Sequence, residues 1–557
     1  LLPAIPNSQE NMKVLVRKPT EHVRKFDGRF LVIVLGMLWL AQVALYLVLG
    51  LMGLDFGFKV WPIGEDLNWI AFMLDGTGSS VAQQLWKVDG RNPLSPWWYI
   101  AAEPLIRATP FGLHIVSQLV YPLLSVSIFL TIERLSRGRA RLFAFSVALI
   151  VLFWTFTGRF DHIQWNMFAA MGCALLSVYF YCGFVDGGRA SSRALVLSLL
   201  FYLIALATYT LQSGALVAVA FLALFRSAEP FKERFLPALI DVCSFGVLFA
   251  IFYLIWVTTT PFPPSSFALD WSLLVRQLEM SVRYFLVPPI LLAHWSDAQV
   301  AFPAHCMVYV FCLASLSFGA LLAKVSQTFP LEFSRALVGW VLVVLLAIGA
   351  PTVLLEATNT TWAPGTRSIM VQPIFQPLLY VSLIFGVAAL VNKRWASLVA
   401  VVLVATLASC VLVAALGYNH RQVALTRQQM SLADALKKVP MGASRPLTFI
   451  VRHLNYDAPY VAMEPTWAHA IRTYGRVVFG DPNVQVRSIR FAGTAANTVC
   501  TGVMVSFVDG GAEIGGAFYP DSQIMVVQFD GKEVAKIESL KASDFQNLCV
   551  LWRRSVN

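Results

Sequence analysis

A polar segment, residues 55–107, follows the first long apolar run and contains two adjacent acids, Glu65 and Asp66, after a Pro-Ile-Gly turn. The next residues have the three- and four-residue spacing of an apolar helix face: Trp69, Ile70, Met73 and Leu74. A helix with one apolar face lies along a membrane surface, so we expect these acids where lipid meets water. A carboxylate in a partly dry pocket can act as general base on an alcohol, because desolvation raises its pKa. The alternative is a solvated acid that only favours the start of a helix.

Asp161 and His162, together with Arg159, form a second group of ionisable residues, in a short turn between two apolar runs. This turn must lie at the membrane edge, where ionisable side chains are costly unless they are paired. We therefore expect Asp161 and His162 to belong to a site, unless an Arg159–Asp161 pair only closes the turn.

Arginines form a third group, predicted on the outer face of the membrane together with these acids. Lys and Arg normally collect on the cytoplasmic side instead. The arginines of this group are Arg91, Arg107, Arg276, Arg283 and Arg367. Arg binds phosphate through two parallel hydrogen bonds. Arg283, with its neighbour Tyr284 on a proline-broken helix, and Arg367, after a Pro-Gly pair, are therefore predicted to hold a lipid phosphate. Each is alternatively a surface charge whose stem lies along lipid.

Further polar and aromatic residues at this membrane edge are candidates to line a sugar pocket. They are Tyr209, Gln212, His294, Glu356 and Trp362. Aromatic residues are also normal at membrane interfaces, so their presence by itself predicts little.

The composition defines the class of protein. Of the 557 residues, 57% are hydrophobic and 13% are charged, and the mean hydropathy is +0.66. A soluble domain has about one quarter charged residues, so the sequence predicts a polytopic membrane protein. The formal charge of +11 does not indicate a nucleic-acid partner, because Lys and Arg collect in short cytoplasmic loops that set topology. The basic residues 1–29 lead into a full-length apolar run, which predicts an uncleaved first span with a cytoplasmic N-terminus.

Apolar runs predict about eleven spans, at roughly 20 residues per crossing. They lie at residues 30–54, 112–133, 141–157, 164–184, 193–208, 213–226, 236–257, 304–325, 335–354, 372–392 and 396–417. Basic connections are expected on the cytoplasmic side: 133–141, 186–193, 225–234 and 392–395. An odd number of spans puts the other connections on the outer face, together with everything after Tyr418.

The chain is thereby divided into a cytoplasmic segment (1–29), a transmembrane domain (30–417) and an outer domain (418–557). The transmembrane domain has a first outer loop at 55–111 and a long outer loop at 258–303, whose prolines predict a re-entrant or interfacial helix.

In the outer domain, clusters of β-branched residues and a hairpin signal at Phe529-Asp530-Gly531-Lys532 predict a small α/β fold. This segment has none of the short catalytic motifs. Its two cysteines, Cys500 and Cys549, are candidates for a disulfide because the outer compartment is oxidising. The other six cysteines lie in or near apolar runs and are predicted to be small core residues: Cys173, Cys182, Cys243, Cys306, Cys312 and Cys410.

The order of these segments resembles the GT-C superfamily of membrane glycosyltransferases. GEDLNW (64–69), GRNPLSPWWYI (90–100) and FGLHIVSQLVYPLLSVSIFL (111–130) are similar to the opening of that family: an acid in the first outer loop, a proline-containing stretch and the second span. FDHIQW (160–165) is similar to the second acidic site of many members. The pairing of GED with GRNPL looks most like the bacterial branch that adds glucose or related sugars to surface polysaccharide.

The resemblance implies a GT-C-like helical membrane fold with interfacial helices in the first outer loop. It implies a multi-pass protein of the bacterial inner membrane that moves a sugar from a polyprenyl-phosphate donor to a hydroxyl of a glycan, lipid or protein in the periplasm. The predicted catalytic residues are Asp66, Glu65 and Asp161. The predicted phosphate-binding residues are Arg283, Arg367, Tyr284 and Arg91, and the predicted pocket residues are His162, Asp55, Trp69, Gln212 and Glu356.

Two departures from the family pattern affect these roles. The acid pair of the family is often Asp-Asp or Asp-Glu, whereas here it is Glu65-Asp66, and Asp55 is a third candidate for the base. An Asp-x-Asp metal motif is missing, so no divalent ion is predicted as a requirement, although the acids are compatible with one.

Other functions fit the same architecture. A secondary transporter or flippase predicts charged residues deep inside spans, whereas the ionisable residues of this sequence cluster at span ends. A polysaccharide polymerase or ligase would depend on outer-loop arginines more than on a first-loop acid. A structural membrane subunit would use the outer domain to bind a partner.

Overall fold

The structure is a computed structural model, and it describes the chain in separate segments. These are residues 28–49, 93–108, 112–138, 140–154, 165–209, 214–226, 230–259, 271–272, 275, 368–391, 393–438, 448–453, 479, 484–489, 505–508, 511–514, 517–529 and 534–537.

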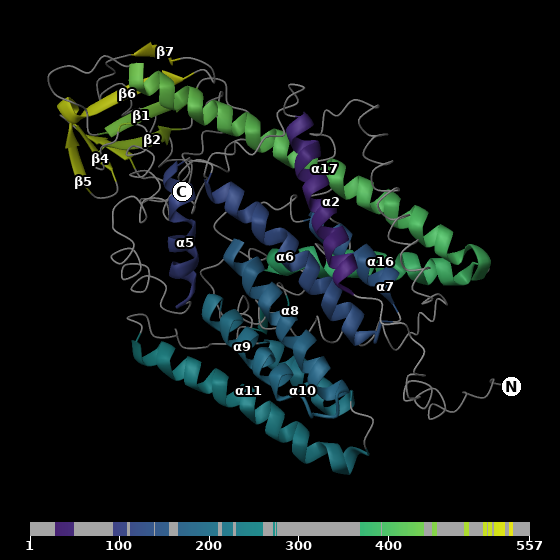
Figure 1. The fold of residues 1–557 in the computed structure, drawn as a ribbon. Coiled ribbons are helices and arrows are strands. Elements are labelled where there is room, and N and C mark those ends of the chain that lie inside the picture. The colour runs from purple at the N-terminus through teal and green to yellow at the C-terminus, as the bar shows by residue number, and fades with distance from the viewer. Residues whose placement is uncertain are drawn as a thin grey trace.

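The described segments are mostly helical (Figure 1). The helices are α2 (Gly28–Leu49), α5 (Ser95–Ala108), α6 (Gly112–Leu135), α7 (Arg141–Trp154), α8 (Trp165–Asp186), α9 (Ser192–Thr208), α10 (Ala215–Phe225), α11 (Phe231–Thr259), α16 (Ser368–Leu390) and α17 (Lys393–Lys438). From 112 to 259 their bounds lie within five residues of the predicted apolar runs, since such runs favour a helix, and the internal Pro122 of α6 and Pro237 of α11 do not end these helices.

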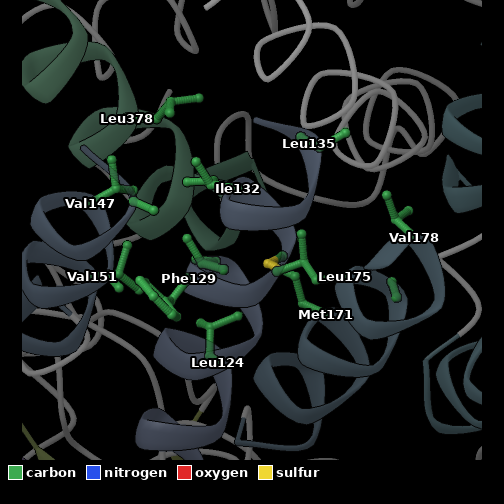
Figure 2. Packing of buried hydrophobic residues seen from close by; sticks show 14 of the residues in the cluster. Leu124, Phe129, Ile132, Leu135, Val147, Val151, Met171, Leu175, Val178 and Leu378 are labelled. Atoms are coloured by element: carbon green, nitrogen blue, oxygen red, sulfur yellow. The ribbon is translucent and has the colours of Figure 1, made fainter. Parts of the chain in front are cut away.

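The centre of the helical part is the contact between α6, α7 and α8. Figure 2 shows α6 between the other two, with Phe129 facing Val151 on one side and Leu175 near Met171 on the other. Phe129, Val151 and Leu175 are fully buried. Because side chains three and four residues apart share one helix face, α6 needs two apolar faces to fill this central position, and its sequence is apolar all round.

Three contacts between neighbouring helices also contain a side-chain hydroxyl that bonds to a backbone carbonyl of the other helix. Ser125 donates to Ala148 O between α6 and α7 at 2.7 Å. Thr131 donates to Leu175 O between α6 and α8 at 2.9 Å. Ser177 and Ser198 each donate to the carbonyl of the other between α8 and α9, both at 2.8 Å. In lipid such bonds hold helices together, since apolar contacts gain little when the solvent is itself apolar.

Three helices of the described part are long and apolar enough to cross a membrane. They are Asn166–Asp186 in α8, Phe231–Thr258 in α11 and Trp395–Val413 in α17. Only 22% of the most apolar part of α11 is buried, against 78% of the corresponding part of α8. An apolar helix that the protein leaves uncovered requires an apolar solvent, so α11 indicates a helical membrane protein.

The two shortest predicted spans form helices that are shorter than a full crossing of the membrane. The run at 193–208 forms α9, whereas the run at 213–226 forms α10, a helix of 11 residues. At about 1.5 Å per residue α10 is only about 16 Å long, roughly half a bilayer core. The predicted runs at 304–325 and 335–354 lie outside the described residues, so the total of eleven spans stays a prediction.

The last predicted span, 396–417, is the first part of a much longer helix. α17 has 46 residues and continues through Tyr418 to Lys438, so no turn separates the apolar stretch from the polar stretch after it. Near its end, Leu432, Ala433 and Leu436 are buried. Figure 1 shows α17 running from its junction with α16 to the strands, which lie at the end of the molecule where α5 is found.

The described residues after 448 form two sheets. In the first, β2 (Gln485–Ile489), β1 (Thr448–His453), β6 (Ile524–Phe529) and β7 (Val534–Ile537) lie in that order, with β1 parallel to β2 and β6. The second is an antiparallel meander of β3 (Val505–Val508), β4 (Gly511–Ile514) and β5 (Ala517–Pro520). Since the consecutive strands β6 and β7 pair antiparallel, with Phe529 opposite Val534, the hairpin predicted between them is confirmed.

The cysteines correct one expectation. Cys173 and Cys182 are buried as predicted, but Cys243 is exposed on α11, so it faces the lipid side of that helix and is not a core residue. Cys306, Cys312 and the predicted pair Cys500 and Cys549 lie outside the described residues.

Candidate functional site

Of the candidate residues, Tyr209 follows α9 directly and is buried, and Arg107 lies within α5; the other residues predicted for the site lie outside the described residues. This holds for the predicted catalytic acids, the phosphate-binding residues and the pocket residues: Asp55, Glu65, Asp66, Trp69, Arg91, Asp161, His162, Gln212, Arg283, Tyr284, Glu356 and Arg367. The described structure nevertheless contains the chain immediately next to several of them. Those flanking residues meet at one end of the helices.

The meeting point, which we call the α5 junction, is made by three hydrogen bonds. Leu94 N donates to Ala207 O at 2.8 Å. Trp98 Nε1 donates to Thr208 Oγ1 at 3.0 Å. Asn166 Nδ2 donates to Ser95 Oγ at 2.7 Å. The start of α5 is thereby attached to the first turn of α8 and to the last turn of α9.

The junction is dry. Ser95 and Thr208 are fully buried and Asn166 is 7% exposed. A hydrogen bond away from water is strong, and a partner left without it costs more than the bond gains when formed. Asn166 Oδ1 has no hydrogen-bond partner among the described residues, so the amide is held through its nitrogen alone. The junction therefore fixes the position of α5 rather than merely covering it.

The local sequence explains why α5 begins here. Pro93 and Leu94 form a turn, and Ser95-Pro96 follows. Pro is favoured in the first helical turn, since its fixed φ suits the helix and its missing N–H would have no partner there. Trp98 N donates to Leu94 O at 3.2 Å, which closes the first turn.

The opposite end of the helices carries an ionic group, the Asp186 cluster, of Asp186, Arg134, Arg137 and Arg226. Arg226 makes a two-point contact with Asp186, Nη2 to Oδ2 at 2.7 Å and Nε to Oδ1 at 3.1 Å. Arg137 Nη2 lies 3.3 Å from Oδ1, and Arg134 Nε lies 3.7 Å from Oδ2. One carboxylate thus faces three guanidinium groups.

Helix C-termini balance this excess of positive charge. Arg226 also donates to Arg134 O at 2.8 Å and to Leu135 O at 3.1 Å, the last carbonyls of α6. Cations are favoured at helix C-termini because the carbonyls there are unpaired and carry partial negative charge. The cluster is therefore a structural cap, whose three guanidinium groups are engaged by one carboxylate and by the end of α6.

The two groups lie at opposite ends of one span. Asn166 and Asp186 are at the two ends of the apolar stretch of α8, 21 residues long, so about 30 Å separates them, the thickness of a bilayer core. The Asp186 cluster joins residues at the ends of α6, α8 and α10, so these three helix ends lie together. The start of α5, the start of α8 and the end of α9 meet at the other end.

One described ionisable residue lies within a predicted span. Asp241 lies inside α11 with its side chain 7% exposed, 3.2 Å from Arg189 Nε. Asp241 is the sixth residue of the predicted span at 236–257, and its partner Arg189 lies in the turn between α8 and α9, so this pair lies toward one end of the span. The sequence signal was present, since an Asp within an apolar run is a candidate for function or pairing by itself.

Metal binding is not indicated within the described segments, where no three His, Cys, Asp or Glu side chains come together. The predicted acids of the outer loops are not among the residues searched, so this finding leaves their metal preference a prediction.

Helical spans, a dry junction at one end and an ionic cap at the other define a helical membrane protein. No protein-family model matches the sequence, and no curated protein matches it. Among solved structures, the chain is similar to the crystal structure of ArnT from Cupriavidus metallidurans bound to undecaprenyl phosphate, with a TM-score of 0.34, 16% identity and coverage of 80% of this chain and 89% of that one. The apo structure of the same protein gives a TM-score of 0.31, 14% identity and coverage of 81% and 86%. At TM-scores this low the likeness does not establish a shared fold.

Proposed function

We propose that this protein is a GT-C type membrane glycosyltransferase that moves a sugar from a polyprenyl-phosphate-linked donor to an acceptor hydroxyl at the outer membrane face. The sequence motifs GEDLNW and FDHIQW motivate the proposal. The observation that carries it further is the α5 junction, because its hydrogen bonds join three segments that each adjoin predicted site residues.

Because the chain is continuous, the number of residues between a predicted site residue and the junction sets an upper limit on the distance between them. Arg91 is three residues before Leu94, so its Cα lies at most about 11 Å from that residue, at about 3.6 Å per residue. His162 is four residues before Asn166, and Gln212 is four residues after Thr208, which gives a limit of about 14 Å for each. Residues that are distant in the sequence are thereby kept near one point, as a shared pocket requires.

The reaction we propose is a single inverting displacement. Asp66 removes the proton from the acceptor hydroxyl, and the oxygen forms a bond to the anomeric carbon of the sugar. The bond from that carbon to the phosphate oxygen breaks, and its electron pair leaves with the polyprenyl phosphate. This leaving group is already a stable anion, so no general acid is required. Arg283, Arg367 and Tyr284 stabilise its charge, which is commonly the largest contribution of such sites.

The remaining predicted residues bind and orient the substrates in this proposal. Asp161 and His162 hold the acceptor or the sugar, and Arg91 assists at the phosphate. Asp55, Trp69, Gln212 and Glu356 line the sugar pocket. The junction end faces the periplasm of a bacterial inner membrane, and the Asp186 cluster faces the cytoplasm, in accord with the excess of Lys and Arg on that side.

The test uses the full chain in proteoliposomes, with polyprenyl-phosphate-linked hexoses as donors and extracted envelope glycans and lipids as acceptors. Asp66→Asn is expected to lower kcat by about 100-fold or more, the usual contribution of a general base. Glu65→Gln tests the adjacent acid, which is the alternative base. Near-normal transfer by folded Asp66→Asn would remove Asp66 from the base role, and absence of transfer from any donor by the unaltered protein would refute the glycosyltransferase proposal.

A further inference from the structure

α11 contacts the rest of the protein through one narrow stripe. Its buried residues, Ala238, Asp241, Phe245 and Phe252, recur at three-, four- and seven-residue spacing. Large apolar residues cover the other faces and are exposed, among them Leu239, Val247 and Leu254. α11 is therefore a peripheral helix with most of its surface toward lipid.

The polar part of this stripe is a three-residue group, the Asp241 clamp, of Asp241, Tyr181 and Arg189. Tyr181 on α8 donates its hydroxyl to Asp241 Oδ2 at 2.8 Å. Arg189, in the turn between α8 and α9, donates from Nε to the same oxygen at 3.2 Å. Tyr181 is fully buried, and the Arg189 side chain is 18% exposed. All three side chains are thus withdrawn from water.

Aromatic contacts continue the stripe next to the clamp. The ring of Phe245 lies edge-on to Tyr181 with 5.8 Å between centroids, and 5.3 Å from the ring of Tyr202 on α9. Phe245 is fully buried. The clamp and this aromatic contact together join α11 to both α8 and α9.

In a bilayer the clamp must provide much of the attachment. An apolar helix face gains little by leaving lipid for protein, because both surroundings are apolar. A carboxylate and a guanidinium that pair inside the protein contribute much more free energy of attachment, because in lipid each would lose its partner. Separation of α11 from the bundle at this point would expose Asp241 to hydrocarbon, so the clamp fixes the position of α11 along and around its axis.

The position of α11 determines where the long outer loop at 258–303 begins. α11 ends at Thr259, and the chain continues directly into this loop, which contains Arg276, Arg283 and Tyr284. Thr259 is 18 residues beyond Asp241, about 27 Å along the helix, so α11 connects the clamp at one end of the span with that loop at the other.

We propose that Asp241 is a positioning residue which, by fixing α11, places the outer loop at 258–303 for the phosphate of the lipid-linked donor. This inference rests on the proposed glycosyltransferase function. It assigns Asp241 no contact with substrate.

The test compares Asp241→Asn, Arg189→Gln, the double variant and Tyr181→Phe in nanodiscs. Nitroxide labels at Leu254 on α11 and Leu398 on α17, both exposed to lipid, report the position of α11. Thr131→Val is the matched control, since it removes a buried hydroxyl bond between α6 and α8 and does not touch α11. We expect Asp241→Asn to broaden or shift the distance between the labels and the control to leave it unchanged.

Transfer kinetics supply the second readout. Asp241→Asn is expected to raise KM for the lipid-linked donor about five- to tenfold, with KM for the acceptor unchanged. A role confined to stability would lower the unfolding temperature without this separation of the two KM values. The double variant keeps the inference testable if Asp241→Asn does not fold, because removing both charges leaves neither buried without a partner.

The outcomes separate the two proposals. An unchanged label distance in Asp241→Asn would overturn the clamp whatever the activity. A displaced α11 with unchanged donor KM would overturn the positioning role and leave the proposed function standing. Absence of transfer by the unaltered protein would refute the proposed function and with it the positioning role, while the label distances would still report on the clamp itself.

Discussion

Asn166 donates a side-chain hydrogen bond of 2.7 Å to Ser95, a residue 71 positions earlier in the chain, inside a buried junction. This one contact joins the start of α5, within the first outer loop, to the start of α8. Asn166 lies directly after FDHIQW, and Ser95 lies within GRNPLSPWWYI. Two motifs that the sequence presents separately are thus attached to each other.

Loss of the Ser95 hydroxyl is expected to reduce activity more than stability. Ser95→Ala leaves the Asn166 amide without its acceptor and should cost about 1 kcal/mol of unfolding free energy. Displacement of the attached loops should lower sugar transfer about tenfold or more, since catalysis is sensitive to small errors in position. Ser125→Ala, which removes a buried bond of equal length between α6 and α7, is the control. Equal activity of the two variants, measured in proteoliposomes, would contradict the role of the junction.

Trp98 and Thr208 are expected to be energetically coupled. Trp98→Phe removes the indole N–H, and Thr208→Val removes its acceptor. The double variant should be less destabilised than the sum of the two single variants by about 1 kcal/mol, because the second change has no bond left to break. Unfolding free energies in detergent complete this double-mutant cycle, and strictly additive losses would show that the bond does not contribute.

The arginines of the Asp186 cluster are expected to contribute differently to the free energy of unfolding. The Arg226 side chain is 7% exposed and bonds both Asp186 and the end of α6, whereas the Arg137 side chain is 44% exposed. Arg226→Ala should destabilise by about 3 kcal/mol, and Arg137→Gln by less than about 1 kcal/mol. Arg226→Lys should recover only part of the loss, since a single ammonium cannot reproduce the planar contacts of a guanidinium. A ranking in the reverse order by thermal unfolding would contradict this account of the cluster.

The proposed orientation in the membrane can be measured by thiol labelling. Trp97 is 60% exposed on α5, and Ala190 is exposed in the turn after α8. In a cysteine-free background, a membrane-impermeant reagent added to spheroplasts should label Trp97→Cys at once. Ala190→Cys should be labelled only after the membrane is permeabilised, because about 30 Å of α8 separates the two ends. The opposite pattern would invert the proposed topology.

The continuity of α17 predicts how the strands respond to insertions. Seven helix-forming residues inserted after Tyr418 add about 10 Å and nearly two full turns. The distance between labels at Leu398 and Phe518, both exposed, should increase and stay narrowly distributed. A Gly-Pro pair inserted at the same place should broaden the distribution, because it breaks the helix. An equally broad distribution without any insertion would show that α17 is not one rigid helix in solution.

Much of the fold follows from local patterns in the sequence. Apolar runs predicted the bounds of the helices from α6 to α11 to within five residues, and the Phe529-Asp530-Gly531 corner predicted the β6–β7 hairpin. Such features are predictable because helix and hairpin hydrogen bonds join residues a few positions apart. That the ends of α6, α8 and α10 lie together was also predictable, since the distribution of Lys and Arg puts the basic connections after them on one side.

The sequence by itself therefore determined a helical membrane protein, its connections and the residue types available for chemistry. Only the tertiary structure decided that Ser95 meets Asn166, that Trp98 meets Thr208, and that Asp241 pairs with Tyr181 and Arg189, contacts that join residues 52 to 110 positions apart. The physical reason is that these bonds depend on how whole helices pack. Periodicity along one helix shows that a polar residue is buried, but the partner that compensates its loss of water lies on another helix.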